Sequence, residues 1–202
     1  MPLQNRVLPT GQIVAHPARG TMMGNRGILH DDARRLGPAR WRHPHWICCV
    51  LSFKGRHRQI MHPKRYTELF FLDEAVALAA GHRPCAECRR ADYTRFRKLW
   101  EQAHGPVATA AALDRALHRA RVTRDRQQVR HHAAARDVPA GSFIAVNDQP
   151  HLVVSDCIFP FTLDGYGSPF ILPKGMTTVL TPAPLVAVLR LGYAPQLHPS
   201  TR

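Results

Sequence analysis

The sequence lacks a long hydrophobic run. Residues 185–191 form an apolar stretch that is too short for a membrane helix and that contains Arg190. Residues 1–20 are interrupted by proline, glycine and polar side chains, so they lack the continuous apolar core of a secretory signal. These absences exclude a membrane partner and predict a soluble protein.

Acidic residues are scarce relative to basic ones. The 202-residue chain has 28 Lys and Arg against 14 Asp and Glu, a formal net charge of +14 with its histidines counted as neutral. Such an excess attracts polyanions, and nucleic acid is the commonest polyanion inside cells. The charge therefore favours a nucleic-acid partner over the other interpretation, an ordinary solvated basic surface.

Cysteines are few, and their number is odd. Five occur, at positions 48, 49, 85, 88 and 157, and the first four form two close pairs. A secreted disulfide framework normally has an even set, whereas close pairs are typical of metal or redox sites in a reducing compartment. The cysteines therefore predict metal or redox chemistry in a reducing compartment, the cytoplasm.

The sequence has no internal repeat, and its first half predicts a mixed structure. Residues 1–40 predict loops and short strands, because Pro and Gly separate their apolar pieces. Residues 46–53 and 58–61 predict an antiparallel hairpin. Asp73 can cap a helix that Gly81 ends in the left-handed conformation.

The second half begins with basic helices and then becomes β-rich. A helix is predicted after Cys88, since large apolar residues recur at helical spacing between residues 96 and 103. Residues 109–136 are rich in Ala and Arg and predict one further helix. A hairpin follows at 143–154, then a strand at 176–180. The last predicted element is a helix capped by Thr181 and ended by Gly192.

Cys85 and Cys88 form the most specific motif. Two cysteines separated by two residues can bind one tetrahedral zinc ion, because a tight turn directs both sulfurs inward. Thioredoxin-like redox sites share this spacing, but no βαβ pattern surrounds it here. The pair therefore predicts half of a zinc site.

The segment that contains this pair resembles the zinc-binding N-terminal domain of the Ada DNA-repair methyltransferase. In that family a helix ending in Ala-Ala-Gly precedes Arg-Pro-Cys-x-x-Cys-Arg. Residues 79–81 (Ala-Ala-Gly) and 83–89 (Arg-Pro-Cys-Ala-Glu-Cys-Arg) match this pattern, and residues 46–49 are similar to the strand that carries the family's first ligand. The resemblance covers about residues 46–92.

The resemblance implies zinc as the cofactor, Cys49 as a third ligand and DNA rather than RNA as the nucleic acid. The family's next ligand is a cysteine, and no cysteine occurs here between Cys49 and Cys85. His62 lies near the corresponding position, and His82 is the alternative. The other histidines left open as the fourth ligand are His57, His45 and His30.

The two remaining cysteines are expected to be structural. Cys48 should point away from Cys49 in the strand and pack as a small hydrophobic residue. Cys157 lies far along the chain and is interpreted as a buried structural thiol.

These observations predict an α+β fold in three parts. Residues 1–106 form a small zinc-knuckle β-hairpin/helix domain, residues 107–137 a basic helical connector and residues 138–202 a small β-rich unit.

The leading functional hypothesis is a zinc-stabilised module that binds nucleic acid through the basic helix after Cys88. Phosphate contacts by basic side chains would make the affinity fall steeply with salt. The residues expected to make them are Arg83, Arg89, Arg90, Arg95, Arg97 and Lys98.

Two other hypotheses remain open. In the first, the protein is an enzyme: the resemblance implies an alkyl acceptor at Cys49, and three zinc ligands with a water would instead suit a hydrolase or nuclease. Residues 23–32 combine two glycines with His30 and Asp31, which offer acid/base groups, or they form an ordinary polar loop. In the second, the protein is a structural or regulatory zinc protein whose C-terminal unit, with an aromatic loop at 166–170, binds a protein partner.

Overall fold

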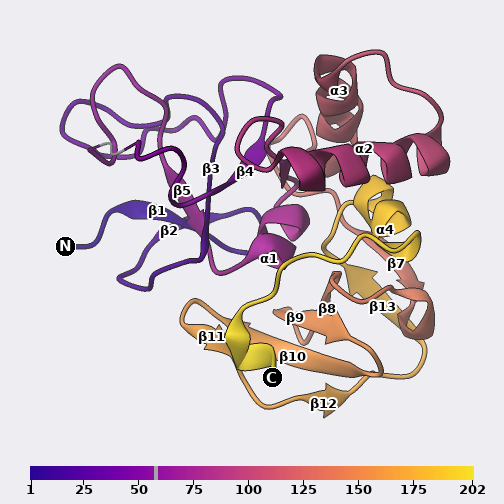
Figure 1. Cartoon of the computed structure of the whole chain (residues 1–202). Coiled ribbons are helices and arrows are strands. Elements are labelled where there is room, and N and C mark those ends of the chain that lie inside the picture. Colours follow the sequence, from indigo (N-terminus) through magenta and orange to yellow (C-terminus); the bar gives the residue numbers. More distant parts are fainter. Residues whose placement is uncertain (57–58) are drawn as a thin grey trace.

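The computed structural model describes residues 1–56 and 59–202. This part of the chain forms two β-sheets and four α-helices, so the expected α+β class is confirmed (Figure 1). None of its helices is both long enough and apolar enough to cross a membrane.

The first sheet is built from the N-terminal 84 residues. Its strands are β1 (Gln4–Val7), β2 (Ile13–Ala15), β3 (Met22–Asn25), β4 (Ile47–Val50), β5 (Leu69–Phe71) and β6 (Arg83–Pro84). They lie in the order β2-β1-β5-β3-β4-β6, with parallel pairing between β1 and β5 and between β4 and β6. The short strands expected in residues 1–40 are therefore present.

The hairpin expected from residues 46–53 and 58–61 does not form. Strand β4 pairs with β3 on one side and with β6 on the other, so both of its edges are occupied. Arg58 lies outside the described residues, and residues 59–61 form no strand. Met61 also has a φ of 53°, which lies in the left-handed region rather than the extended one.

Helix α1 (Glu74–Ala79) begins and ends where the sequence predicts. The side chain of Asp73 accepts a hydrogen bond from Val76 N, as an N-cap does. Gly81 has a φ of 83°, and its N–H donates to Leu78 O while His82 N donates to Ala77 O. This pair of bonds is the Schellman arrangement. It turns the chain directly into β6.

Three helices pack together beside the first sheet: α2 (Arg90–His104), α3 (Ala110–Arg121) and α4 (Ala183–Arg190). The apolar residues predicted at helical spacing supply the contact, since Phe96 and Trp100 of α2 share one cluster with Leu117 of α3 and Leu185 of α4. Thr181 does not cap α4. Its hydroxyl accepts a hydrogen bond from Phe143 N instead.

The second sheet contains the strands of the C-terminal half. They are β7 (His131–Ala134), β8 (Phe143–Val146), β9 (Gln149–Val154), β10 (Cys157–Thr162), β11 (Gly165–Tyr166), β12 (Phe170–Ile171) and β13 (Met176–Val179). Short 3-10 helices lie at Ala135–Asp137 and Pro199–Thr201. The order is β11-β10-β9-β8-β13-β7, and β12 pairs with β10. Asn147 and Asp148, with φ of 49° and 60°, make the two-residue turn of the predicted β8–β9 hairpin.

The expected connector, residues 107–137, is part of the packed structure. Its first half forms α3, and its last residues form β7 at the edge of the second sheet. The aromatic loop at 166–170 is also partly packed, because Tyr166 is buried and donates to the carboxylate of Asp73. Phe170, by contrast, is exposed.

One hydrophobic core joins the two sheets. It includes Val7 and Phe71 of the first sheet, Val76 of α1, and Phe143 and Leu152 of the second sheet. Helix α1 lies between the sheets in Figure 1. The two β-rich parts therefore fold against each other.

Candidate metal centre

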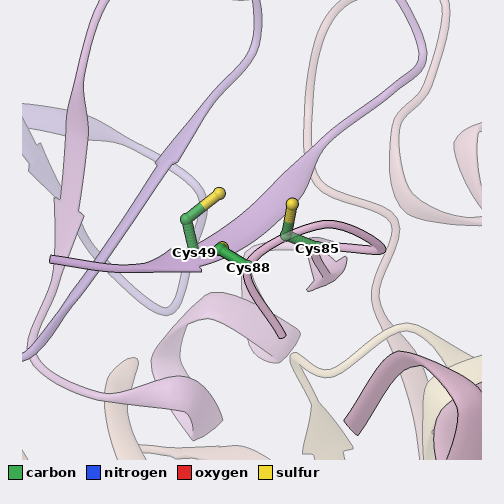
Figure 2. Close-up of side chains that lie close together, drawn as sticks. All are labelled: Cys49, Cys85 and Cys88. Carbon is green, nitrogen blue, oxygen red and sulfur yellow. The ribbon is translucent and has the colours of Figure 1, made fainter. Parts of the chain in front are cut away.

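Three cysteines from two distant segments meet beside the first sheet. Cys49 is on β4, and Cys85 and Cys88 are on the loop between β6 and α2 (Figure 2). Their sulfur atoms all lie within 4.8 Å of one another. The convergence that the sequence predicts for these three residues is therefore present in the structure.

The pairing of β4 with β6 brings the two segments together. Cys48 is the register partner of Pro84, and Cys85 N donates to Cys48 O over 2.9 Å. Adjacent strand residues face opposite sides, so Cys49 faces the loop while Cys48, fully buried, packs in the core as expected.

The loop itself is a tight turn that opens α2. Glu87 N lies 3.4 Å from the sulfur of Cys85, and Arg89 N donates to Cys85 O. The Arg89 guanidinium is clamped at the base of the loop by Glu74 at 2.7 Å and Asp92 at 2.8 Å. The backbone that carries both cysteines is thus fixed from inside the protein.

Hydrogen bonds among the three thiols shift their pKa values in opposite directions. The hydrogen bond from Cys49 lowers the pKa of Cys85 to about 5, and the same donor lowers the pKa of Cys88. The pKa of Cys49 is raised, because its thiol donates to the other two sulfurs. Negative charge therefore concentrates on the loop, where a cation could replace the shared proton.

The donor set fits a soft or borderline metal ion. Thiolate sulfur suits zinc, and a Zn–S length of about 2.3 Å places tetrahedral sulfurs about 3.8 Å apart. The observed cluster, within 4.8 Å, needs only a small contraction to reach that spacing. Cys49, Cys85 and Cys88 can therefore hold a metal ion.

No histidine of the described residues joins the three cysteines. His62 is exposed and contacts Pro63 O, while His82 is fully buried beside Trp46 on the core side. Neither of the two expected fourth ligands is among the residues that cluster with the sulfurs, so a fourth ligand stays a prediction. His57 lies outside the described residues.

The other two histidines that the sequence left open have different partners. His45 Nδ1 lies 2.8 Å from Asp114 Oδ2, and His30 Nδ1 lies 2.7 Å from Thr67 Oγ1. Asp31 is exposed and accepts from Arg35 N in a surface turn. His30 and Asp31, the expected acid/base candidates, are not among the clustered residues, and Asp31 lies in a polar surface turn.

A cavity of about 450 Å³ opens beside the cysteines, and all three line it. Glu68 lines it as well. Its Oε2 accepts from Met61 N at 2.7 Å, and its Oε1 is buried without a hydrogen-bond partner among the described residues. Cys49 is thus reachable from a cavity that also contains a carboxylate. The sequence signal that could have found Glu68 is a lone acid directly before the apolar run that forms β5.

Two of the residues expected to contact phosphate, Arg83 and Arg89, are buried in ion pairs. Arg83 is buried and makes a bidentate ion pair with Asp114, both bonds being 2.8 Å long. Arg89 is equally buried in its pair with Glu74. These arginines hold the fold together, because their guanidinium groups are already bound to carboxylates away from solvent.

The remaining basic residues of α2 lie nearer the surface. Arg95 pairs with Asp92, and Arg97 pairs with Glu101. Arg90 and Lys98 are exposed, and neither has an ion pair with a described residue. The charge available to a polyanion on α2 is therefore smaller than the sequence suggests.

Comparisons with profiles of known protein families, with curated proteins and with solved structures find no match to this chain. The resemblance to the Ada zinc domain stays a prediction.

Proposed function

We propose that the protein is a zinc protein that binds nucleic acid, and that the metal centre fixes the start of the basic helix α2. The observation that carries the proposal is the meeting of Cys49, Cys85 and Cys88 within 4.8 Å, immediately before that helix. The nucleic acid is DNA rather than RNA, which is the expectation that the resemblance supports.

The metal part of the proposal is supported by the chemistry of the donors. A sulfur-only set from two separate segments gives a cross-link whose binding free energy adds to the stability of the fold. Free cysteines that meet by chance in a core are packed as hydrophobic residues, as Cys48 is. The three clustered cysteines instead surround a common point beside a cavity.

The nucleic-acid part is supported by the excess of basic residues. The chain carries a formal net charge of +14. Once the buried pairs of Arg83 and Arg89 are set aside, Arg90 and Lys98 still present exposed charge on the helix that follows the cysteine loop. Phosphates are the partner that such a surface attracts.

Metal content tests the first part. Protein produced with ample zinc should contain stoichiometric zinc, measured by mass spectrometry of the metal, and Cys49→Ser, Cys85→Ser and Cys88→Ser should each lose most of it. Cys157→Ser is the matched control, since Cys157 is a half-buried cysteine outside the cluster. Retention of full zinc by Cys85→Ser would contradict the proposal.

Salt-dependent binding tests the second part. The double variant Arg90→Gln/Lys98→Gln should bind duplex DNA more weakly, with a log–log salt slope smaller by about 2, since each lost phosphate contact removes about 0.9. Fluorescence anisotropy at several salt concentrations measures both quantities, and an RNA duplex of the same sequence should bind less tightly. Lys174→Gln, at an exposed site in the second sheet's part of the chain, is the charge control. Absence of binding at low salt would overturn this part while leaving the metal result intact.

A further inference from the structure

A second cavity, of about 520 Å³, lies away from the cysteines. It shares no lining residue with the cavity beside the metal centre. Its walls come from the loop after β1, from the segment between β3 and β4, and from the end of α3 with the chain that follows it. None of the functional residues named so far lines this cavity.

Two arginines of this cavity are buried without a carboxylate. Arg26 and Arg121 are each 2% exposed, and neither forms an ion pair with a described residue. Arg26 donates to Gly11 O and lies 3.3 Å from His82 Nε2, and Arg121 donates to Gly81 O and Pro44 O. Burying an unpaired charge is costly, so native proteins normally supply a counter-charge.

Each of these guanidinium groups keeps one donor unused. Arg26 Nη2 and Arg121 Nε are buried and have no hydrogen-bond partner among the described residues. At Gly11, which also lines the cavity and has a φ of 81°, a side chain would start 4.0 Å from Arg26 Nη2. Gly11 therefore lies at contact distance from that donor, on the cavity wall.

The electrostatics of the cavity are uniformly positive. Five arginines line it and no acidic residue does. Burial lowers the pKa of Arg26 to about 9, with a further decrease from the charge of Arg40, and burial also lowers the pKa of Arg121. Asp114 is the carboxylate that opposes the shift of Arg121, but it is committed to its bidentate pair with Arg83. An anion would relieve this unbalanced charge.

The indole ring of Trp46 holds both guanidinium groups in place. The Cζ atoms of Arg26 and Arg121 lie 4.0 and 3.8 Å from the ring centroid, within the range of cation–π contacts. The Arg121 side chain packs directly over Gly81, in space that a side chain at position 81 would fill, since a Cβ there would meet Arg121 Cδ at 2.5 Å. The two donors are therefore positioned before any ligand arrives.

We propose that this cavity binds the phosphate group of a nucleotide, with Arg26 and Arg121 as the buried phosphate ligands. Arginine pairs recognise phosphate oxygens by charge-assisted hydrogen bonds. The volume is in the range of small-molecule sites. Trp41, half-buried on the wall, offers a ring for stacking, and exposed Arg130 offers a further charge. The phosphate belongs either to a free mononucleotide or to the end of a nucleic-acid strand.

Tryptophan fluorescence of the zinc-loaded full chain tests this site, because Trp41 and Trp46 line the cavity and Trp100 lies elsewhere. Titration with inorganic phosphate and with adenosine 5′-monophosphate should give saturable changes, and adenosine should give none. A short single strand with a 5′-phosphate, compared with its 5′-hydroxyl form, distinguishes the two sources. Tighter binding of the phosphorylated strand than of the mononucleotide identifies a strand end, and the reverse identifies a free nucleotide.

Substitutions locate the binding within the protein. Arg26→Gln should weaken phosphate binding about tenfold or more, as loss of a charged hydrogen bond does. Arg130→Gln, at an exposed position on the wall, should weaken it without affecting folding. Arg124→Gln is the matched control, since Arg124 is exposed in the same segment but does not line the cavity. The absence of saturable binding by every phosphorylated probe, or unchanged binding in Arg26→Gln and Arg130→Gln, would overturn the proposal.

This site is independent of the proposed function. Arg90→Gln/Lys98→Gln should leave mononucleotide binding unchanged, because neither residue lines the cavity. Failure of duplex binding and failure of phosphate binding would therefore be separate results.

Discussion

At the residue scale, neighbours in the sequence have opposite environments. Cys48 and Cys49 are adjacent. Burial in the core raises the pKa of Cys48, whereas the thiol of Cys49 donates to the sulfurs of Cys85 and Cys88. The alternation of a β-strand produces this difference. One cysteine is a packing residue and the next is a ligand candidate.

His82 has a similar dependence on its surroundings. Its ring is fully buried beside Trp46 and Phe71, and burial lowers its pKa well below 6.5, with further decreases from Arg26 and Arg121. The side chain is therefore neutral in the folded protein. It packs in the core, where Arg26 Nε lies 3.3 Å from its Nε2.

The lowered pKa of His82 predicts that the folded protein becomes less stable in acid. In the unfolded chain, the histidine at position 82 takes up a proton near pH 6.5, whereas in the folded protein it does not. The free energy of unfolding is therefore largest above that pH and decreases as the pH falls below it. His82→Gln should reduce the slope of stability against pH between about pH 6.5 and pH 5. Urea unfolding at several pH values measures this slope, with His62→Gln, at an exposed site, as the control. Equal slopes in wild type and His82→Gln would contradict the prediction.

At the scale of elements, α1 is short but connects most of the molecule. Asp73 Oδ2 accepts from Tyr166 and from His198 N. Glu74 Oε1 accepts from Tyr193, and Glu74 Oε2 accepts from Arg89 and from Gln196 N. The carboxylates of the N-cap and of the first helical residue thus hold the C-terminal tail and the base of the cysteine loop.

The buried contacts of Glu74 predict that its substitution lowers the free energy of unfolding substantially. Glu74→Gln removes one partner of a buried ion pair whose side chains are each 1% exposed. Because Arg89 keeps its pair with Asp92, the expected cost is at the lower end of that for breaking a buried pair, about 3 kcal/mol. Glu101→Gln is the matched control, because it breaks the partly exposed pair with Arg97, worth about 1 kcal/mol or less. Equilibrium urea unfolding compares the two. Similar losses in both variants would show that Glu74 is not the main connection.

The same scale explains the hairpin that did not form. Residues 46–53 are rich in β-formers, and β4 does lie within them. Its partners, however, come from 22–25 and 83–84 rather than from the residues that follow. Local turn signals predict neighbouring pairs, whereas the burial of side chains in the whole sheet decided this pairing.

At the scale of the whole molecule, basic residues fall into three groups. Some, such as Arg83 and Arg89, are paired inside the protein. Others, such as Arg90 and Lys98, are exposed on α2. Arg26 and Arg121 are buried without a carboxylate in a cavity. Each of these residues adds one positive charge to the net charge of the sequence. Only the fold shows which of them are available to a ligand.

The sequence by itself determined the elements with strong local signals. Asp73 and Gly81 delimit α1, the apolar spacing after Cys88 produces α2, and the turn at Asn147 closes a hairpin. These features depend on interactions between residues close along the chain, such as caps, glycine conformations and side-chain periodicity. They can be predicted without knowledge of the rest of the fold.

The tertiary structure decided the contacts between distant segments. The parallel pairing of β4 with β6 brings Cys49 to Cys85, and the burial of Arg26 with Arg121 creates the positive cavity. Both depend on which surfaces exclude water together, a property of the packed chain rather than of any local pattern. For the same reason, the sequence could nominate histidines as ligands but could not show that His62 is exposed and His82 lies in the core.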